Sequence, residues 1–237
     1  MQARMRLLFI QTLKSIEMTL SIKQEIWRKS FHLLCLIFPI IFAYFGKIKA
    51  MTIFIAFLIL MIFIEIIRFN KQLQNITLLK LTNIAIFQRI KNIVVYIARE
   101  EEIKGKRLFG ATWLILGAVI CFGFFEKNIA TISFIILAIA DTNSAIIGKS
   151  FVGKKFIDKT TFGSLAFFIS SLIIVIFSTI TIGGNYILFF NFVITIVLVT
   201  VVEAFKFRIN IDDNFTIPIS FCTIATILNH FFPYGSQ

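Results

Sequence analysis

The residues between Ile139 and Leu165 hold the densest chemistry of the chain, reading IADTNSAIIGKSFVGKKFIDKTTFGSL. Gly148, four residues, Gly153 and Lys154 come within one residue of the phosphate-binding loop G-x-x-x-x-G-K-[ST], with Lys155 in the last position. A loop of that kind follows a buried β-strand and opens a helix in an α/β domain. Here a long apolar run precedes the glycines, and no alternation of strands and helices follows. We therefore reject a soluble nucleotide-binding loop.

The same stretch still has the composition of a polyphosphate site. Its glycines free the backbone, and its basic and hydroxyl side chains supply charge and hydrogen bonds. The candidate phosphate or nucleotide ligands in this stretch are Ser144, Gly148, Lys149, Lys154, Lys155, Lys159, Thr160, Gly163 and Ser164.

Asp141 lies deep in an apolar segment that begins near Ile129. At about 1.5 Å per residue it sits roughly 18 Å into a hydrocarbon core of about 30 Å. An ionised carboxylate there costs about 2.5–3.5 kcal/mol, so it normally faces a polar cavity, a partner or a metal. Ser144 and Gly148 share its helical face, where another molecule could approach the backbone closely. The alternative is a structural hydrogen bond between helices.

A second group precedes the first apolar segment in the sequence EIWRKSFH. Helical spacing places Glu25, Arg28 or Lys29, and His32 on one face, where the basic residues could hold a phosphate. An alternative is a positive anchor at the membrane edge, with His32 as a hydrogen-bonded structural residue. His230, near the other end, is interpreted as structural.

Two acid–base pairs flank the long polar segment in the first half of the chain. Glu65 with Arg68, and Arg99 with Glu102, are each three residues apart, which is the spacing of helical ion pairs. We interpret all four as structural or supporting residues.

A final group begins at the inner end of the sixth apolar segment. Glu203 is followed by Asp212, Asp213 and Asn214. Carboxylate and amide oxygens are the ligands that Mg²⁺ prefers, so Asp141, Glu203 and Asp213 are the candidate metal ligands and Asn214 a candidate nucleotide ligand. A turn or helix cap is the plain alternative for the residues Asp212 to Asn214.

The composition decides what kind of molecule must position these residues. Of the 237 residues 58% are hydrophobic and 15% charged, and the mean hydropathy is +0.92. Soluble domains carry about 25% charged residues, so we expect an all-α integral membrane protein. The net charge of +12 is explained by the basic cytoplasmic loops that are typical of membrane proteins. A nucleic-acid partner is therefore not expected.

Seven segments approach the length of about 20 apolar residues that a spanning helix needs. They are roughly 31–45, 51–67, 108–125, 129–147, 163–182, 186–205 and 215–232. Under the positive-inside rule the N-terminus is cytoplasmic, because only Lys47, Lys49 and Lys127 of the 24 Lys and Arg residues fall on the outer side. Of the 12 acidic residues only Glu126 falls there, which places the polar site at the cytoplasmic face.

The rest of the chain divides simply. Residues 1–30 form an amphipathic cytoplasmic segment, and residues 31–232 form one membrane domain with cytoplasmic loops at about 68–107, 148–162 and 206–214. Interfacial helices are expected over 5–22 and 78–97. The isolated Cys35, Cys121 and Cys222 predict neither a disulfide nor a zinc site, and no signal peptide is evident.

The order of these motifs resembles the CTP-dependent lipid-alcohol kinases, which include dolichol, phytol and CTP-using diacylglycerol kinases and are distantly related to phosphatidate cytidylyltransferases. The similarity covers nearly the whole chain: E-x-x-R-K-x-x-H, R-x-x-E before G-A-T, D-x-x-S-A-x-x-G, K-T-x-x-G-S, and D-N-x-x-x-P. The chain departs from the family pattern at Val152, an insertion, and at Phe162, where the family has Glu. The His-Gly-Gly and Asp-Arg signature of the cytidylyltransferases is absent.

The resemblance implies transfer of the γ-phosphoryl group of CTP, with Mg²⁺, to the hydroxyl of a polyprenol, phytol-like alcohol or diacylglycerol in the cell inner membrane. Asp141 would be the first candidate for the base and His32 the second, with Lys159 also catalytic. Cytidylyl transfer to a lipid phosphate is the nearest alternative. An ion-coupled transporter that uses Asp141 is the non-enzymatic alternative.

Overall fold

The computed structural model describes residues 27–30, 32–70, 107–151, 153–205 and 211–233. Several of the predicted features lie outside these residues: Glu25, Arg99, Glu102, Val152 and the interfacial helices over 5–22 and 78–97.

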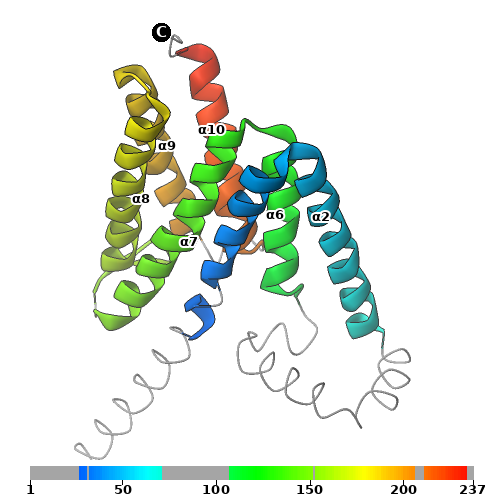
Figure 1. The fold of residues 1–237 in the computed structure, drawn as a ribbon. Helices are drawn as coiled ribbons and strands as arrows, with labels where there is room; N and C mark the ends of the chain where they lie inside the picture. Colours follow the sequence, from blue (N-terminus) through cyan, green and yellow to red (C-terminus); the bar gives the residue numbers. More distant parts are fainter. Residues whose placement is uncertain (1–26, 31, 71–106, 152, 206–210, 234–237) are drawn as a thin grey trace, which may run out of the picture.

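The described chain is almost entirely helical (Figure 1). A 3₁₀ turn η1 (Leu33–Leu36) leads into α2 (Ile37–Phe69), followed by α6 (Gly110–Phe124), α7 (Lys127–Ser150), α8 (Thr161–Ile182), α9 (Tyr186–Ala204) and α10 (Asp213–Phe231). Two short strands, β1 (Lys155–Phe156) and β2 (Lys159–Thr160), form an antiparallel hairpin between α7 and α8. The helices match the predicted apolar segments within a few residues, while the hairpin was not predicted.

Local sequence signals set several helix ends. The side chains of Thr160, Asn185 and Asp212 cap α8, α9 and α10 by accepting hydrogen bonds from backbone N–H groups of the first turn. Gly183 ends α8 in the left-handed conformation, with φ of 72°.

The helix α2 consists of two arms that leave a bend at Gly46 in different directions (Figure 1). Gly46 has φ 74° and ψ 172°, which favours glycine, and an added Cβ would meet no atom within 4 Å. The backbone conformation, and not lack of space, therefore selects glycine here. The arms correspond to the first two predicted segments.

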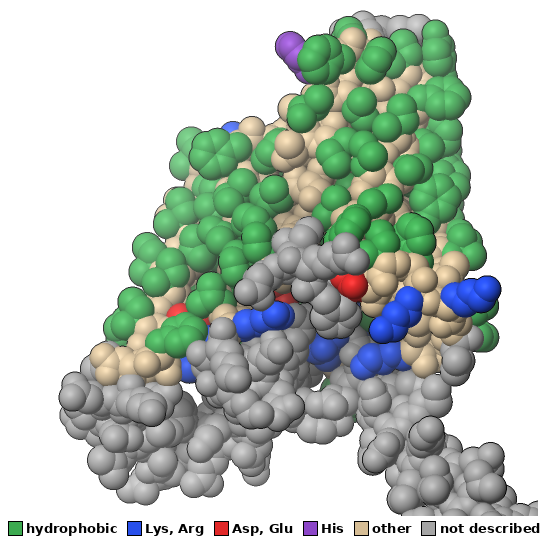
Figure 2. All heavy atoms as spheres, turned by 180° about the vertical axis from the view of Figure 1, so that it is seen from behind, with side chains coloured by type: hydrophobic (Ala, Val, Ile, Leu, Met, Phe, Trp, Pro, Cys, Tyr) green, Lys and Arg blue, Asp and Glu red, His purple; other side chains and the backbone are tan. Residues whose placement is uncertain are grey.

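Four helices of the described part are long and apolar enough to cross a membrane: Trp27–Phe69, Lys127–Ser150, Thr161–Ile182 and Tyr186–Ala204. The helix α6 is apolar but shorter. Figure 2 shows hydrophobic side chains over the wall of one face, with acidic and basic side chains gathered toward one end. The predicted all-α membrane protein is confirmed at this level.

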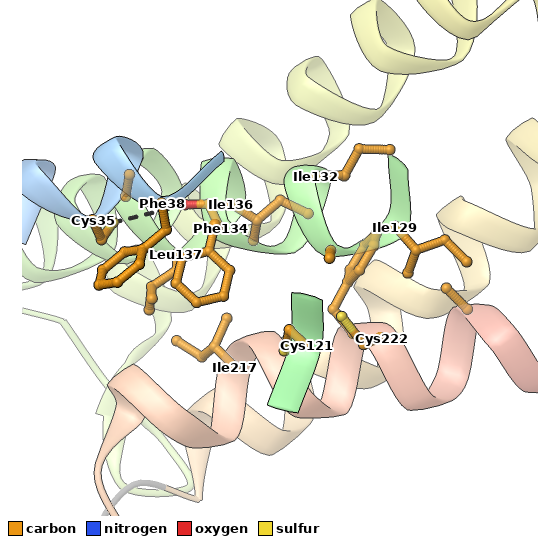
Figure 3. Packing of buried hydrophobic residues seen from close by; sticks show 14 of the residues in the cluster. Cys35, Phe38, Cys121, Ile129, Ile132, Phe134, Ile136, Leu137, Ile217 and Cys222 are labelled. Atoms are coloured by element: carbon orange, nitrogen blue, oxygen red, sulfur yellow. Dashed lines mark hydrogen bonds between the residues drawn. The ribbon is translucent and has the colours of Figure 1, made fainter. Parts of the chain in front are cut away.

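Aromatic rings join the helices in the core. Phe38, Phe54, Phe122 and Phe134 lie in ring contact, with centroids 5.1–5.8 Å apart. The three cysteines are buried and free. Cys121 on α6 and Cys222 on α10 lie side by side there (Figure 3).

Candidate functional site

Four charged side chains from distant parts of the chain form what we call the ionic cluster. Lys29 comes from the helical turn before η1, Asp141 from α7, Lys159 from β2 and Glu203 from α9. Lys29 forms an ion pair with Asp141, and Lys159 forms one with Glu203. The ammonium nitrogen of Lys159 also lies 3.8 Å from Oδ1 of Asp141, which joins the two pairs.

The cluster is almost closed to solvent. The side chains of Lys29 and Lys159 are 6% and 12% exposed, and those of Asp141 and Glu203 are 1% and 0% exposed. Buried ions that lose one partner are strongly destabilising, because a desolvated charge is left uncompensated. Each of these four charges thus depends on its neighbours.

His32 lies beside Asp141 at the edge of the cluster. Its Nε2 is 3.2 Å from the carbonyl oxygen of Leu137 and 3.5 Å from Oδ2 of Asp141. Both neighbours accept hydrogen bonds, so Nε2 must carry the proton. In the neutral imidazole the lone pair is then on Nδ1, the only ring atom through which His32 could act as a base.

Several carboxylates act on the charge of Lys159. Burial works to lower the pKa of Lys159. The carboxylates of Asp213, Glu203 and Asp141 outweigh that effect and raise the pKa above its ordinary value. Ser144 donates a hydrogen bond of 2.7 Å to Oε1 of Glu203, the oxygen that also contacts Lys159.

The hairpin is the element that carries Lys159 into the cluster. Lys155 pairs with Thr160 and Phe156 with Lys159, and the N–H of Asp158 donates to the carbonyl oxygen of Ala204 at 3.2 Å. That bond ties the hairpin turn to the end of α9, directly after Glu203. Ile157 in the turn has φ of 59°, a strained value for a β-branched residue.

Three residues predicted to contribute to a nucleotide site lie at the contact between α7 and α8. A Cβ on Gly163 would lie 3.1 Å from the carbonyl oxygen of Ser144 and 3.3 Å from the Cα of Gly148. Thr160 caps α8 through Gly163 and donates to the carbonyl oxygen of Gly148 at 3.2 Å. The close backbone approach expected on the face of Asp141 is therefore made by α8 of the same chain.

The other basic candidates are more accessible to solvent than the ionic cluster. Lys149, Lys154 and Lys155 are exposed and Arg28 is half-buried. Phe162, at the position where the resembled family has Glu, packs against Phe151 with centroids 5.7 Å apart. Figure 2 shows basic side chains gathered at the polar end of the molecule.

Asp212 and Asp213, at the start of α10, have different roles: Asp212 caps the helix, and Asp213 acts on the ionic cluster. Asp212 accepts from the N–H of Asn214 at 3.0 Å, and the side-chain amide of Asn214 donates to the carbonyl oxygen of Gly110 at 2.9 Å. Asn214 thus ties α10 to α6. Asp213 is buried, and its charge acts on Lys159.

The predicted magnesium ligands do not form a three-carboxylate cage. Among the described residues no group of three or more His, Cys, Asp or Glu side chains is close enough to hold a metal ion. The ammonium of Lys159 lies between these carboxylates instead. Oε2 of Glu203 is buried and has no hydrogen-bond partner in the described part, and Ser164 Oγ is in the same condition. One or two carboxylates with phosphate oxygens and water are the usual ligand set for Mg²⁺, and the residues fit that set.

A second buried carboxylate lies at the junction of α2 and α6. Glu65 accepts from the N–H of Phe109 at 2.6 Å and from the hydroxyl of Thr112 at 3.0 Å, and it forms an ion pair with Arg68. Arg68 also donates to the carbonyl oxygen of Arg107 and lies over the ring of Phe109. Glu65 thereby fixes the start of α6.

Sequence reasoning missed two contributors to this polar architecture. Thr112 follows Gly110 and Ala111, so its place in G-A-T was the available signal. Asn143 donates to Ser170 at 2.8 Å between α7 and α8, and no pattern in the sequence marks that pair. His230 is exposed at the end of α10, where it contacts the ring of Phe231.

Comparison with known proteins gives one distant relative and no family. The chain is 28% identical over 208 residues to an uncharacterized protein of Rickettsia prowazekii (strain Madrid E), covering 87% of this chain and 94% of the relative. No protein-family profile and no solved structure matches the chain.

Proposed function

We propose that this protein is a membrane phosphotransferase that moves the γ-phosphoryl group of CTP to the hydroxyl of a lipid alcohol. The observation that carries the proposal is the ionic cluster: two buried carboxylates and two buried lysines, joined at the polar end of an apolar bundle beside a lysine-rich hairpin. Phosphoryl transfer depends mainly on positioning and on neutralising charge. Such a cluster supplies both.

The proposed topology has seven membrane crossings, with the two arms of α2 counted as two of them. The protein would lie in the cell inner membrane with its N-terminus in the cytoplasm. The positive-inside pattern of the sequence supports this orientation. It brings the ionic cluster to the cytoplasmic face, where a nucleotide arrives from solution and the lipid hydroxyl lies at headgroup level.

The side chains then have separate roles. Lys149 at the end of α7 and Lys154 and Lys155 at the hairpin are exposed and would attract the triphosphate, and Lys159 would contact it inside. Glu203 and Asp213 would hold Mg²⁺, which supplies neutralisation of the phosphate charge.

In this proposal Asp141, or His32 beside it, would take the proton of the acceptor hydroxyl. The oxygen of the lipid hydroxyl forms a bond to the γ-phosphorus, the bond from that phosphorus to the bridging oxygen of CDP breaks, and the hydroxyl proton passes to a base. Asp141, which forms an ion pair with Lys29, is the first candidate for this base and His32 is the second. A loose transition state depends little on a strong base, so a carboxylate is sufficient for this role.

The choice of CTP over ATP rests on the resemblance in the motif order. Cytidylyl transfer to a lipid phosphate would use the same kind of site but would release pyrophosphate in place of CDP. A transporter would need polar residues along a path through the membrane. Among the described residues the buried charged side chains are those of Lys29, Glu65, Asp141, Glu203, Asp212 and Asp213. Lys29, Asp141, Glu203 and Asp213 all act on one cluster around Lys159 and do not form a series along one path.

The test is product formation by the purified protein in detergent with Mg²⁺ and γ-labelled CTP or ATP. The acceptors are a polyprenol, phytol and diacylglycerol. Asp141→Asn is the variant, and Lys127→Met, an exposed change at the opposite end, is the control. We expect label in a lipid, with CTP preferred, and a loss of at least 100-fold in Asp141→Asn.

Two results would reject the kinase. Pyrophosphate released with phosphatidate as acceptor, and no labelled lipid alcohol, would favour the cytidylyltransferase. No reaction with either set of substrates, together with ion flux through proteoliposomes that Asp141→Asn abolishes, would favour the transporter.

A further inference from the structure

Lys159 occupies the place among the carboxylates where a cation is needed. Its ammonium contacts Glu203 and lies 3.8 Å from Oδ1 of Asp141. Asp213 is the third acid whose charge acts on it. A buried carboxylate group without a cation would be strongly destabilised by desolvation. The ammonium of Lys159 therefore supplies the positive charge that compensates these carboxylates.

The position of Lys159 on the hairpin allows its ammonium to move away from the carboxylates. The residue lies on a short hairpin, and its side chain has four rotatable bonds, so the charged group can move without a shift of either helix. The neighbouring Lys154 and Lys155 on the same hairpin are exposed to solution. A polyanion that binds these two lysines would offer Lys159 a second partner close by.

A ligand that separates Lys159 from the carboxylates must provide a new counter-ion both for the ammonium and for the carboxylates. A divalent cation alone would have to displace the Lys159 ammonium, leaving it buried without a counter-ion. A polyphosphate alone would draw Lys159 away and leave the carboxylates uncompensated. Only the two together replace each charge of the cluster with a partner of the opposite sign.

We propose that divalent cation binding at Glu203 and Asp213 is coupled to polyphosphate binding, because polyphosphate draws Lys159 off the carboxylates. This inference rests on the proposed function for the nature of the ligand, and it adds an order to it: the metal enters with the triphosphate and not before. Oε2 of Glu203 is the oxygen already available to the metal, since it has no hydrogen-bond partner among the described residues. By linkage, the metal must raise the affinity for polyphosphate by the same factor.

The experiment maps the metal on the protein directly and does not depend on turnover. Fe²⁺ replaces Mg²⁺ in the purified full-length protein, and peroxide then generates hydroxyl radicals that cut the backbone near the bound metal. The cuts are located by mass spectrometry, with and without inorganic tripolyphosphate, and excess Mg²⁺ serves as competitor. In the wild-type protein we expect cuts near residues 203 and 213 to be at least tenfold stronger with tripolyphosphate than with Fe²⁺ alone.

Variants separate the role of Lys159 from simple charge attraction. Lys159→Met should be cut at the same places by Fe²⁺ alone, because the competing cation is gone. Lys127→Met, which removes an equal charge at the far end, should behave as the wild type. Glu203→Gln keeps the size of the side chain and should lose at least tenfold of the cutting near residue 203 even with tripolyphosphate. If Lys159→Met does not fold, the wild type and Glu203→Gln still decide the question.

The proposal is overturned if Fe²⁺ alone cuts the wild type at these places as strongly as Fe²⁺ with tripolyphosphate. It is equally overturned if tripolyphosphate only suppresses cutting, as it would by chelating the metal in solution. Failure of the transferase assay with coupled cutting intact would reject the proposed function and leave the coupled site standing. Transfer to a lipid with uncoupled cutting would do the reverse.

Discussion

The contact between Gly148 on α7 and Gly163 on α8 gives a prediction that can be worked out from distances. In Gly163→Ala the new Cβ would lie 3.1 Å from the carbonyl oxygen of Ser144, 3.1 Å from Oγ1 of Thr160 and 3.3 Å from the Cα of Gly148. Favourable separations between such atoms are about 3.5–4.0 Å. Two of the three neighbours are backbone atoms, so the start of α8 must move away from α7.

The expected cost follows from two opposing effects. Overpacking a tight contact costs about 1–3 kcal/mol, whereas replacing glycine by alanine inside a helix gains up to about 1 kcal/mol. We therefore expect Gly163→Ala to lower the free energy of unfolding by about 1–2 kcal/mol. Because β2 runs directly into α8, the shift also displaces Lys159, and transfer activity should fall with stability.

Gly123→Ala is the matched control. Gly123 also lies in a helix, but its added Cβ would meet only the terminal methyl of Met51, at 3.2 Å. That flexible side chain can move aside, so the free energy of unfolding should stay level or rise by up to about 1 kcal/mol. Reversible unfolding in mixed detergent and dodecyl sulfate, followed by tryptophan fluorescence, measures both variants.

The result that would refute this reasoning is a Gly163→Ala protein as stable as the wild type. If that protein had also lost affinity for nucleotide, the glycine would be a nucleotide contact, as the sequence alone predicts. If Gly123→Ala lost as much stability as Gly163→Ala, the cost would belong to alanine in these helices in general and not to the approach of α7 and α8.

Three further predictions test other contacts. Thr112→Val removes the hydroxyl that donates to buried Glu65 and should cost about 1 kcal/mol in the same unfolding assay; no change would mean that the N–H of Phe109 alone suffices. Ser170→Ala leaves the amide of Asn143 without its partner inside the membrane and should cost about 0.6 kcal/mol, whereas Ser178→Ala on the same helix, as a control, should cost less. The pKa of Lys159 is raised in the folded protein. Its contribution to the free energy of unfolding is therefore fully present below its pKa in the unfolded chain, about 10.4, and is lost only as the pH rises through its pKa in the folded protein. The difference in stability between the wild type and Lys159→Met should accordingly be constant from pH 7 to pH 10, and a difference that shrinks across this range would contradict the raised pKa.

The helices could be predicted from the sequence because their causes are local. Apolar runs of membrane length fix where helices lie, and capping residues such as Thr160 and Asp212 fix where they begin. The bend at Gly46 fell between two predicted segments for the same reason. The hairpin from Lys155 to Thr160 was missed because strands of two residues are too short to show any periodicity.

Partners in space could not be predicted, because nothing local encodes them. The glycine at position 148 correctly indicated a close backbone approach, but the sequence could not say that α8 itself makes it. Similarly, Asp141 was expected to face a polar partner, yet Lys29 lies 112 positions away along the chain. The three acids were grouped as metal ligands because their chemistry is alike, while the position of Lys159 between them depends on the unpredicted hairpin.

The arrangement of the ionic cluster follows from a conflict between folding and binding. The proposed site for a polyanion and a divalent cation needs both acids and bases, yet buried charges of either sign are costly until they are paired. Pairing Lys29 with Asp141 and Lys159 with Glu203 lets the ligand-free protein fold with these charges compensated internally. Buried ion pairs contribute little net stability compared with apolar residues of the same size. A purely structural role would therefore be served at least as well by apolar side chains, and the retention of four buried charges at one end of an apolar bundle favours a role in binding.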